Sequence, residues 1–432
     1  MITDAMWIKE YPAEWKPIAF KRGIKRMATG LNPRDNFELN PDSDANIYYV
    51  TIRNFKNGRI FLDEKCDMIT QEAWKIIQER SDLHKGDILF ASISEEGNVY
   101  VLDDEPNNWN INESVFCIRV NREWFMPEFF AYMVTNQMYY SDLRSDATGT
   151  TFLSIKQNKL KESILLAPPI EDQHNIVHYL DSKCSAIDEA IERHKKIIEK
   201  LEEHRKASAF NAVTKGISGS ELKPSGEEWL GDIPKHWSVQ RNWTLFKEVN
   251  ERGNDTLPIL TVSINTGISD RELSDDESDR VFVRSADKSK YKRVQPGDIA
   301  YNMMRAWQGA FGAARVEGMV SPAYVTVRPI KEMDSRYFEY LMRSDSAAQE
   351  FEKYSRGITD FRLRLYYPEF SNIRVCVPPL VEQTEIADYL DDLYKKTDIA
   401  VERVNAIIAK LEEYRKSIIY NAVTGKIDCR EA

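Results

Sequence analysis

The sequence predicts an α+β protein in which two globular domains are each followed by a long helix, and the two helices pair as an antiparallel coiled coil. Three observations support this. A 47-residue stretch occurs twice, at 168–214 and 378–424, and 23 of its positions are identical without a gap. Each copy has the composition of a long helix. The region before each copy contains short runs rich in Val, Ile, Tyr and Phe, which are typical of strands. A repeat of this length indicates two equivalent halves.

Each repeated stretch is expected to form one helix. Both copies begin with a Pro-Pro pair, which cannot continue a helix from upstream but can precede one. No further proline or glycine occurs before Gly216 and Gly425, which stand where a helix C-terminus belongs. About 40 residues at 1.5 Å each give a helix of roughly 60 Å.

The apolar residues of both helices recur at alternating spacings of four and three, as in a coiled-coil seam. The remaining positions are mostly Glu, Lys and Arg, so a narrow seam needs a partner helix. We expect that partner to be the other copy, because two helices in one chain have a high effective concentration for each other. Lying antiparallel, they would be related by a pseudo-two-fold axis. The alternative is a homodimer in which each helix pairs with a second chain.

The expected interface residues belong to this seam, in which copy one has His194 where copy two has Val404. They are Leu180, Ile187, Ile191, Ile198, Leu201, Leu390, Val401, Val404, Ile408 and Leu411.

The repeat extends into the globular regions. The segment from Trp7 to Trp15 matches 229–237, and 85–90 matches 296–301. The predicted boundaries are a first domain at 1–165, a first long helix at 166–215, a flexible Gly/Ser-rich linker at 216–228, a second domain at 229–375 and a second long helix at 376–432. Strands are expected at 47–52, 88–91, 115–118, 257–262, 281–283 and 324–327, and aromatic-rich helices at 127–140 and 335–351.

Composition supports folded domains rather than disorder, with 42% apolar and 11% aromatic residues in 432. No apolar run approaches the roughly 20 residues of a membrane helix, and no signal-peptide pattern opens the chain. The five cysteines are scattered and form no C-x-x-C pair, so a reduced, cytoplasmic protein is expected. The net charge of −10 argues mildly against a nucleic-acid partner unless base and acid occupy separate regions.

Basic residues do cluster in both globular regions. Residues 15–60 contain nine basic and four acidic side chains. Basic clusters beside Asn, Gln and aromatic residues are suited to binding DNA phosphates and recognising the edges of bases. The alternative is an ordinary solvated surface. The candidate DNA-contacting residues are Arg22, Lys25, Arg53, Lys56, Arg59, Arg284, Lys290, Lys292, Arg293, Arg305, Arg356 and Arg362.

Catalytic signatures are missing from the sequence. There is no G-x-x-x-x-G-K-[ST] motif, and the Pro-Pro pairs lack the neighbours of an amino-methyltransferase loop. His174 and His178 have the i, i+4 spacing of a metal pair, but no third ligand is evident, so surface histidines are expected. We therefore expect no catalytic residue, no metal and no cofactor. The paired tryptophans at 7, 15, 229 and 237 are interpreted as packing anchors.

The architecture resembles the specificity subunit of type I restriction–modification systems. The resemblance rests on the two P-P-[IL]-x-x-Q helices ending in K-L-E-E-x-R-K and N-A-V-T, and on the W-[IL]…P-x-x-W segments. It implies that each globular region is a target recognition domain reading one half of an asymmetric bipartite sequence in double-stranded DNA. It also implies that the paired helices set the gap between half-sites and dock two modification (methyltransferase) subunits, which restriction subunits join. No active site and no membrane partner are implied.

Two alternatives remain open at this point. One is a coiled-coil adaptor without a DNA role. The other is a stand-alone methyltransferase or nuclease whose site follows no familiar motif. The bases read, the gap between half-sites and the assignment of each domain to a half-site do not follow from the sequence.

Overall fold

In a computed structural model the chain forms two compact units, residues 1–194 with 406–432, and residues 195–405. Each unit contains one α+β domain and a part of both long helices, α6 (Ile170–Lys215) and α10 (Leu380–Val423). The structure describes residues 7–8, 10–34, 36–41, 45–56, 58–92, 98–144, 155–253, 256–264, 266–272, 290–357 and 363–430, without the side chains of Lys56 and Arg144. Unit 1 is the one that contains the first domain, and unit 2 contains the second.

The domain of unit 1 is built on a four-stranded antiparallel sheet in the order β2-β10-β7-β8. A smaller sheet, in the order β6-β3-β9, supports helix α2 through β9. The strands are β2 (Ile24–Thr29), β3 (Ile47–Val50), β6 (Asp67–Ile69), β7 (Ile88–Ala91), β8 (Val99–Val101), β9 (Trp109–Ile111) and β10 (Val115–Val120), and α2 is Gln71–Ser81. The predicted strands at 88–91 and 115–118 lie in the central pair, whose side chains are almost all buried.

The first domain is closed by pairing its beginning with its end. Strand β1 (Lys16–Ala19) pairs antiparallel with β11 (Ile164–Ala167), which leads directly into α6. Helices α1 (Phe20–Gly23) and α5 (Gln157–Glu162) pack beside this pair. The helix start is therefore held by residues from both ends of the domain sequence.

The helix expected over 127–140 is two helices, α3 (Pro127–Thr135) and α4 (Gln137–Arg144). The break falls at Asn136, whose side chain accepts a hydrogen bond from the backbone N–H of Met138 and so begins a new helix. The same division occurs in unit 2, where the side chain of Ser344 caps the second helix.

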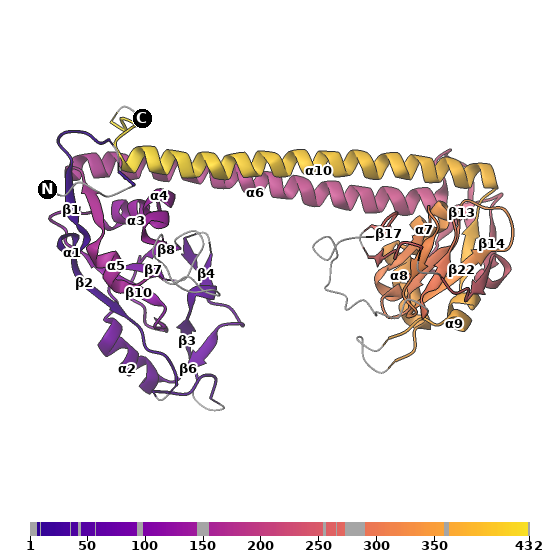
Figure 1. The fold of residues 1–432 in the computed structure, drawn as a ribbon, viewed down its shortest axis with the longest axis horizontal. Coiled ribbons are helices and arrows are strands. Elements are labelled where there is room, and N and C mark those ends of the chain that lie inside the picture. The colour runs from indigo at the N-terminus through magenta and orange to yellow at the C-terminus, as the bar shows by residue number, and fades with distance from the viewer. Residues whose placement is uncertain are drawn as a thin grey trace. The chain divides into compact units, whose positions relative to one another are not determined.

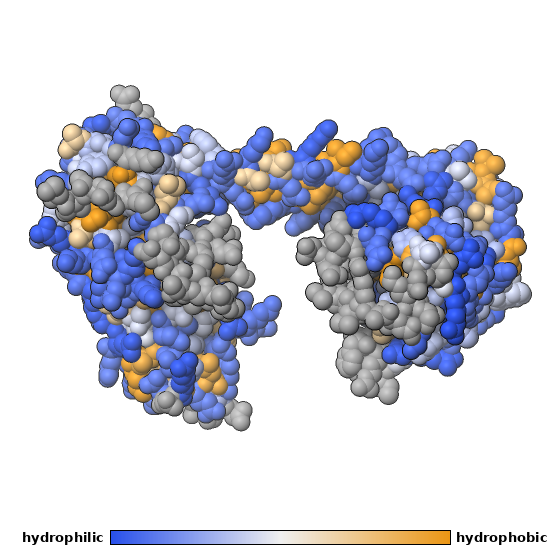
Figure 2. All heavy atoms as spheres, viewed as in Figure 1, coloured by the Kyte–Doolittle hydropathy of each residue, from blue (hydrophilic) through white to orange (hydrophobic). Residues whose placement is uncertain are grey.

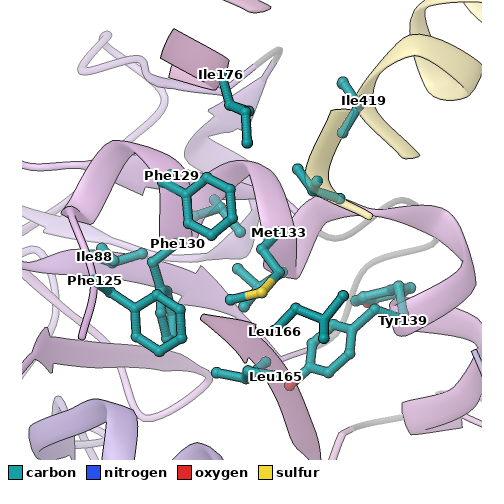
Figure 3. Close-up of a cluster of buried hydrophobic side chains, with 14 of the residues drawn as sticks. Ile88, Phe125, Phe129, Phe130, Met133, Tyr139, Leu165, Leu166, Ile176 and Ile419 are labelled. Carbon is teal, nitrogen blue, oxygen red and sulfur yellow. The ribbon is translucent and has the colours of Figure 1, made fainter. Parts of the chain in front are cut away.

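The core of unit 1 joins the domain to both long helices. In Figure 3, Phe129 and Met133 of α3 lie between Leu166 of β11 and residues of the long helices, Ile176 of α6 and Ile419 of α10. All five side chains are buried. Because one apolar cluster includes α3, β11, α6 and α10, the domain and the helix pair of this unit form a single core.

Unit 2 repeats this plan. Its main sheet has the order β15-β22-β19-β20, and β14 pairs with β23, the strand that leads into α10. Two small antiparallel pairs, β16–β17 and β18–β21, complete the sheet structure of this unit. The elements are β14 (Ser238–Arg241), β15 (Phe246–Val249), β16 (Val262–Ser263), β17 (Gly267–Ile268), β18 (Lys292–Val294), β19 (Ile299–Asn302), β20 (Phe311–Ala313), β21 (Gly318–Val320), β22 (Tyr324–Pro329), β23 (Arg374–Val377), α7 (Ser335–Met342), α8 (Asp345–Tyr354) and α9 (Tyr367–Asn372).

Two sequence predictions need correction in this unit. The strand predicted over 257–262 is confined to β16, with an isolated bridge at Ile259 before it. The linker predicted to be flexible contains a strand, β12 (Leu222–Pro224), which pairs antiparallel with β13 (Asp232–Pro234). Lys223 stabilises this hairpin by donating to the carbonyl of Trp237 at 2.8 Å. The predicted strand at 281–283 lies outside the described residues.

The two long helices pair antiparallel within each unit (Figure 1). In unit 1, Arg415 of α10 lies 3.3 Å from the carboxylate of Asp188 on α6. In unit 2, Arg205 of α6 lies 2.7 Å from the carboxylate of Asp398 on α10. Arg205 and Arg415 occupy equivalent repeat positions, and so do the two aspartates. The arginine comes from α10 in unit 1 and from α6 in unit 2. The same contact therefore occurs in both units with the two helices exchanged, as a pseudo-two-fold repeat requires.

The predicted seam residues lie along this helix pair. Buried at the interface are Leu180, Ile187, Ile191 and Leu390. Half-buried are Ile198, Leu201, Val401, Val404, Ile408 and Leu411. Burial is greatest where the domains cover the helices. His194 fits the seam because its ring nitrogen bonds the carbonyl of Ala190 in its own helix, at 2.7 Å. None of the helices in the described ranges is long and apolar enough to span a membrane.

Leu180 and Leu390 are equivalent and fully buried, each in the core of a different unit. Substituting either by Ala should lower the free energy of unfolding of its own unit by about 2–5 kcal/mol, because a cavity replaces packed methyl groups. Denaturant unfolding followed by circular dichroism measures the effect. Leu201→Ala, at a half-buried seam position, is the matched control and should cost clearly less. Equal losses at all three positions would contradict the burial pattern.

Candidate nucleic-acid interface

The basic residues predicted in the first domain do not form one patch. Arg22 lies on α1 and Lys25 on β2, an edge strand of the main sheet. Arg53 lies in a short 3-10 helix, η1 (Ile52–Asn54), and Arg59 on β5 (Arg59–Ile60), which pairs with β4 (Phe55–Lys56). Strand β5 contacts β8, the opposite edge of that sheet. The structure therefore separates the candidates into two exposed groups.

A neighbouring cationic residue, Arg26, is already engaged. Its guanidinium donates to the carbonyls of Arg80 and Ser81 at 2.8 and 2.7 Å, and lies 3.1 Å from the carboxylate of Asp82. Burial pushes the pKa of Asp82 upward, but a hydrogen bond from His84 and the charges of two arginines lower it overall. The Asp82 carboxylate therefore stays ionised and holds Arg26 at the C-terminal end of α2.

In the second domain, β18 carries the candidates Lys292 and Arg293. The ammonium group of Lys292 donates to the carbonyl of Tyr324 at 2.8 Å, and burial lowers the pKa of this lysine. Arg293 donates to Glu317 at 2.7 Å and lies 3.9 Å from Glu251. Both cations therefore have partners within their own domain. Lys290 precedes β18 and is exposed, whereas Arg284 lies outside the described residues.

Arg305 and Arg356 belong to segments of the second domain that are linked by backbone contacts. Arg305 follows β19 and precedes η4 (Ala306–Gln308). The backbone of Leu365 bonds Met303 of the same turn, and Arg364 forms a bridge with Arg356. Arg356 is paired with the carboxylate of Glu369. Within the described ranges Arg305 has no ion-pair partner, and Arg362 lies outside them.

The joints between each domain and its long helix were not predicted as functional. The buried side chain of Gln173 donates to the carbonyls of Trp124 and Pro168 at 2.8 and 2.9 Å and accepts from the N–H of Met126 at 2.9 Å. Its equivalent, Gln383, accepts from the N–H of Asp334 at 2.9 Å. These glutamines are the Q of the repeated P-P-[IL]-x-x-Q motif, so the repeat itself was the signal.

A second joint repeats in the same way. Tyr132 donates to Asp181 of α6 at 2.6 Å, and Tyr340 donates to Asp391 of α10 at 2.6 Å. In unit 2, Arg336 adds contacts of 2.8 Å to both Asp388 and Asp391. Each domain is thus tied to its helix by polar side chains as well as by the apolar core.

Each domain also contains a buried carboxylate paired with an arginine of the neighbouring strand. Arg119 of β10 binds Asp87 through two nitrogens, both at 2.8 Å. Arg328 of β22 binds Asp298 in the same way, at 2.7 and 2.9 Å. The aspartates belong to the matched Gly-Asp-Ile segments of the repeat. A bidentate pair of this kind fixes the sheet geometry in each half.

The four paired tryptophans are placed as packing residues. Trp7, Trp15, Trp229 and Trp237 are all buried. His174 and His178 are exposed on α6, and no group of three potential metal ligands occurs in the part of the chain that the structure describes.

Two equivalent domains, each fixed to a shared helix pair and each presenting arginines on its surface, define a duplicated two-domain scaffold protein. The chain belongs to the family described as the type I restriction modification DNA specificity domain, whose sequence model matches residues 31–203 and 230–412. Each match covers most of one domain and runs into its long helix.

Related proteins carry the same description. The chain is 22% identical over 426 residues to the type I restriction enzyme EcoKI specificity subunit of Escherichia coli (strain K12), covering 94% of this chain and 87% of that one. It is 23% identical over 344 residues to the EcoBI specificity subunit of Escherichia coli, covering 73% and 69%.

Two solved structures share the fold. A chain from a type I R-M system, studied for complex assembly and conformational transition, superposes with a TM-score of 0.66 at 17% identity, covering 97% of this chain and 100% of that one. The HsdS subunit from Thermoanaerobacter tengcongensis gives a TM-score of 0.50 at 17% identity, covering 97% and 99%. The α+β class with two long helices is therefore shared with type I specificity subunits.

The charge network around Asp82 predicts a pH effect on stability. Both ring nitrogens of His84 contact carboxylates, Glu105 and Asp82, each at 2.9 Å, which raises the pKa of His84. The stability that protonated His84 contributes is therefore fully present below about pH 6.5, the ordinary pKa of an unfolded histidine. It is lost as the pH rises through the higher pKa of the folded state. Thermal melts across this range should show that His84→Gln flattens the pH dependence. A variant with the wild-type profile would contradict the assignment.

Proposed function

We propose that this chain is the DNA specificity subunit of a type I restriction–modification enzyme and reads an asymmetric bipartite target. The observation that carries the proposal is that the family match occurs twice, once over each domain and its helix. Two reading domains on one paired-helix scaffold suit a target with two half-sites, because scaffold geometry then sets their separation. The relatives are named as specificity subunits of type I restriction enzymes.

The different chemistry of the two domains supports an asymmetric target. The scaffold strands, the buried Asp–Arg pairs and the glutamine joints repeat, whereas the exposed residues do not. Arg53 and Arg59 of the first domain have no basic equivalents in the corresponding segment of the second, which reads Ser263-Ile264 and then Gly267-Ile268. Two unlike surfaces on equivalent frameworks are suited to two unlike half-sites.

The outer faces of the long helices support a docking role for partner subunits. Figure 2 shows a mainly hydrophilic helix surface with separate hydrophobic side chains. Ile197 of α6 and Ile407 of α10 occupy equivalent positions and are 44% and 43% exposed. Tyr389 and Tyr414 of α10 are also exposed. Equivalent exposed apolar positions on both helices are consistent with two modification subunits, which restriction subunits would join. We further propose that the chain has no active site of its own and works in the cytoplasm.

Co-expression with the methyltransferase subunit of the same host tests this function. Methylation mapped by sequencing should fall at two unlike half-sites separated by a fixed gap, because each domain reads one of them. The methyltransferase subunit without this chain is the control and should show no such site. Methylation that lacks sequence preference in the presence of the chain would refute the proposal.

Arg305 offers a test of the second domain alone. Arg305→Gln should weaken DNA binding by the complex and reduce the salt slope by about 1, the amount expected for one lost phosphate contact. Arg374→Gln removes the same charge from an exposed residue of β23 that is paired with Glu227 at 3.2 Å, and serves as the control. Fluorescence anisotropy with a DNA duplex containing the mapped site measures both. Equal slopes for the two variants would remove Arg305 from the interface.

A further inference from the structure

One hairpin in the first domain combines a rigid base with exposed cationic side chains. It comprises residues 51–61 and is called the basic hairpin below. Its strands β4 and β5 pair Phe55 with Ile60 and Lys56 with Arg59, and its turn contains Gly58 at φ +68°. Residues 51–62 include three basic residues and no acidic residue. The segment is therefore cationic, although the chain as a whole has a net charge of −10.

The base of the hairpin is held by Asn54. Its side-chain oxygen accepts from the N–H of Thr51 at 2.8 Å, and its amide donates to the carbonyl of Phe61 at 3.3 Å and to the sulfur of Cys66 at 2.9 Å. Phe55 is buried in an apolar cluster with Leu89. The hairpin is therefore clamped at its base, and its exposed residues project from a fixed support.

The exposed residues have the chemistry of a DNA contact. Arg53 and Arg59 are exposed and have no ion-pair partner among the described residues. Phe61 beside them is 44% exposed. Arginine binds phosphate and guanine edges through two parallel hydrogen bonds. Here, unlike at Arg26 or Arg293, no carboxylate in the described part of the domain holds the guanidinium groups.

An equivalent hairpin occupies the same place in the second domain. Residues 49–52 and 259–262 correspond in the repeat, and the hairpin of β16 and β17 also contains a glycine with positive φ, Gly267 at +76°, which is the first residue of β17. The basic hairpin contacts β8 through β5, and the equivalent hairpin contacts β20, which has the same edge position in its sheet. One framework position thus carries a cationic hairpin in one domain and Ser263-Ile264 in the other.

The equivalent hairpin is fixed by different residues. Gly267 lies against the buried carboxylate of Glu339, so that any side chain there would collide with it. Arg343, the residue that follows α7, bonds Glu339 of that helix at 3.2 Å and contacts the carbonyl of Ile264 at 3.4 Å. Both hairpins are therefore pre-organised, although the contacts that hold them are unrelated. Conserved placement with exchanged chemistry is what two domains reading different sequences require.

We propose that the basic hairpin is the element with which the first domain contacts DNA, with Arg53 and Arg59 binding phosphate oxygens or guanine edges. The inference rests on the proposed function and assigns the DNA contact of the first domain to one edge of its main sheet. The competing group, Arg22 and Lys25, lies at the other edge, where α1 packs against β1, β11 and α5. That region repeats as scaffold in the second domain, as the β14–β23 pair.

The test compares Arg53→Gln/Arg59→Gln with a control that removes the same charge elsewhere. Binding of the full chain to a labelled random-sequence duplex is measured over a range of salt concentrations. Losing two phosphate contacts should make the slope of log K against log salt about 1.8 less steep, at 0.9 for each contact. The control, Lys75→Gln/Arg122→Gln, changes two exposed residues outside the hairpin and should keep the wild-type slope. Thermal melts establish that all variants are folded.

Three further outcomes are decisive. A folded hairpin variant with the wild-type slope overturns the assignment. A loss of slope in Arg22→Gln/Lys25→Gln, with none in the hairpin variant, overturns it in favour of the other edge. Co-expression with the methyltransferase subunit separates this result from the proposed function. If the wild-type chain directs methylation to a bipartite site while the hairpin variant retains both half-sites and the wild-type slope, only the hairpin inference fails.

Discussion

The narrow apolar seam of the long helices is the constraint on which the rest of the structure depends. Neither helix can bury its seam alone, because the other faces are charged, and each finds its partner in the equivalent helix of the same chain. The reciprocal pairs Arg205–Asp398 and Arg415–Asp188 show that both ends of the helix pair use one contact pattern. Each unit consequently needs both halves of the chain, since its helix pair combines the beginning of one long helix with the end of the other.

Fixing the domains to the helices is the second requirement of the proposed reading of two half-sites. A reading surface that swivels on its support cannot define a distance. The Pro-Pro pair stops the preceding strand, and Gln173 or Gln383, one turn into the helix, satisfies backbone groups of the loop before the aromatic helix. Tyr132 and Tyr340 add a bond from that helix to an aspartate of the long helix. Directed polar contacts of this kind specify one orientation where apolar packing alone tolerates several.

The pattern of neighbouring residues in the sequence predicted the long helices well and the charge distribution of the folded surface poorly. The seam spacing and the Pro-Pro and glycine boundaries belong to neighbouring residues, so the sequence shows them directly. The sequence does not show ion pairs in this way, because Arg293 meets Glu251 and Arg26 meets Asp82 only after the sheets form. Counting basic residues along the chain therefore included cations that the fold neutralises. The strand in the linker was missed for a similar reason, since β12 is stabilised by a partner strand rather than by its own composition.

The acidic total of the chain does not oppose contact with DNA at a cationic surface. At physiological ionic strength the screening length is about 8 Å, so a phosphate group responds to charges in its immediate surroundings and hardly to the net charge of the molecule. The two long helices together carry 18 acidic and 14 basic residues, so the acid is spread along the chain and is not confined to them. Because Arg53 and Arg59 have no carboxylate partner in the described part of the first domain, a local basic surface persists on a chain whose total charge is negative.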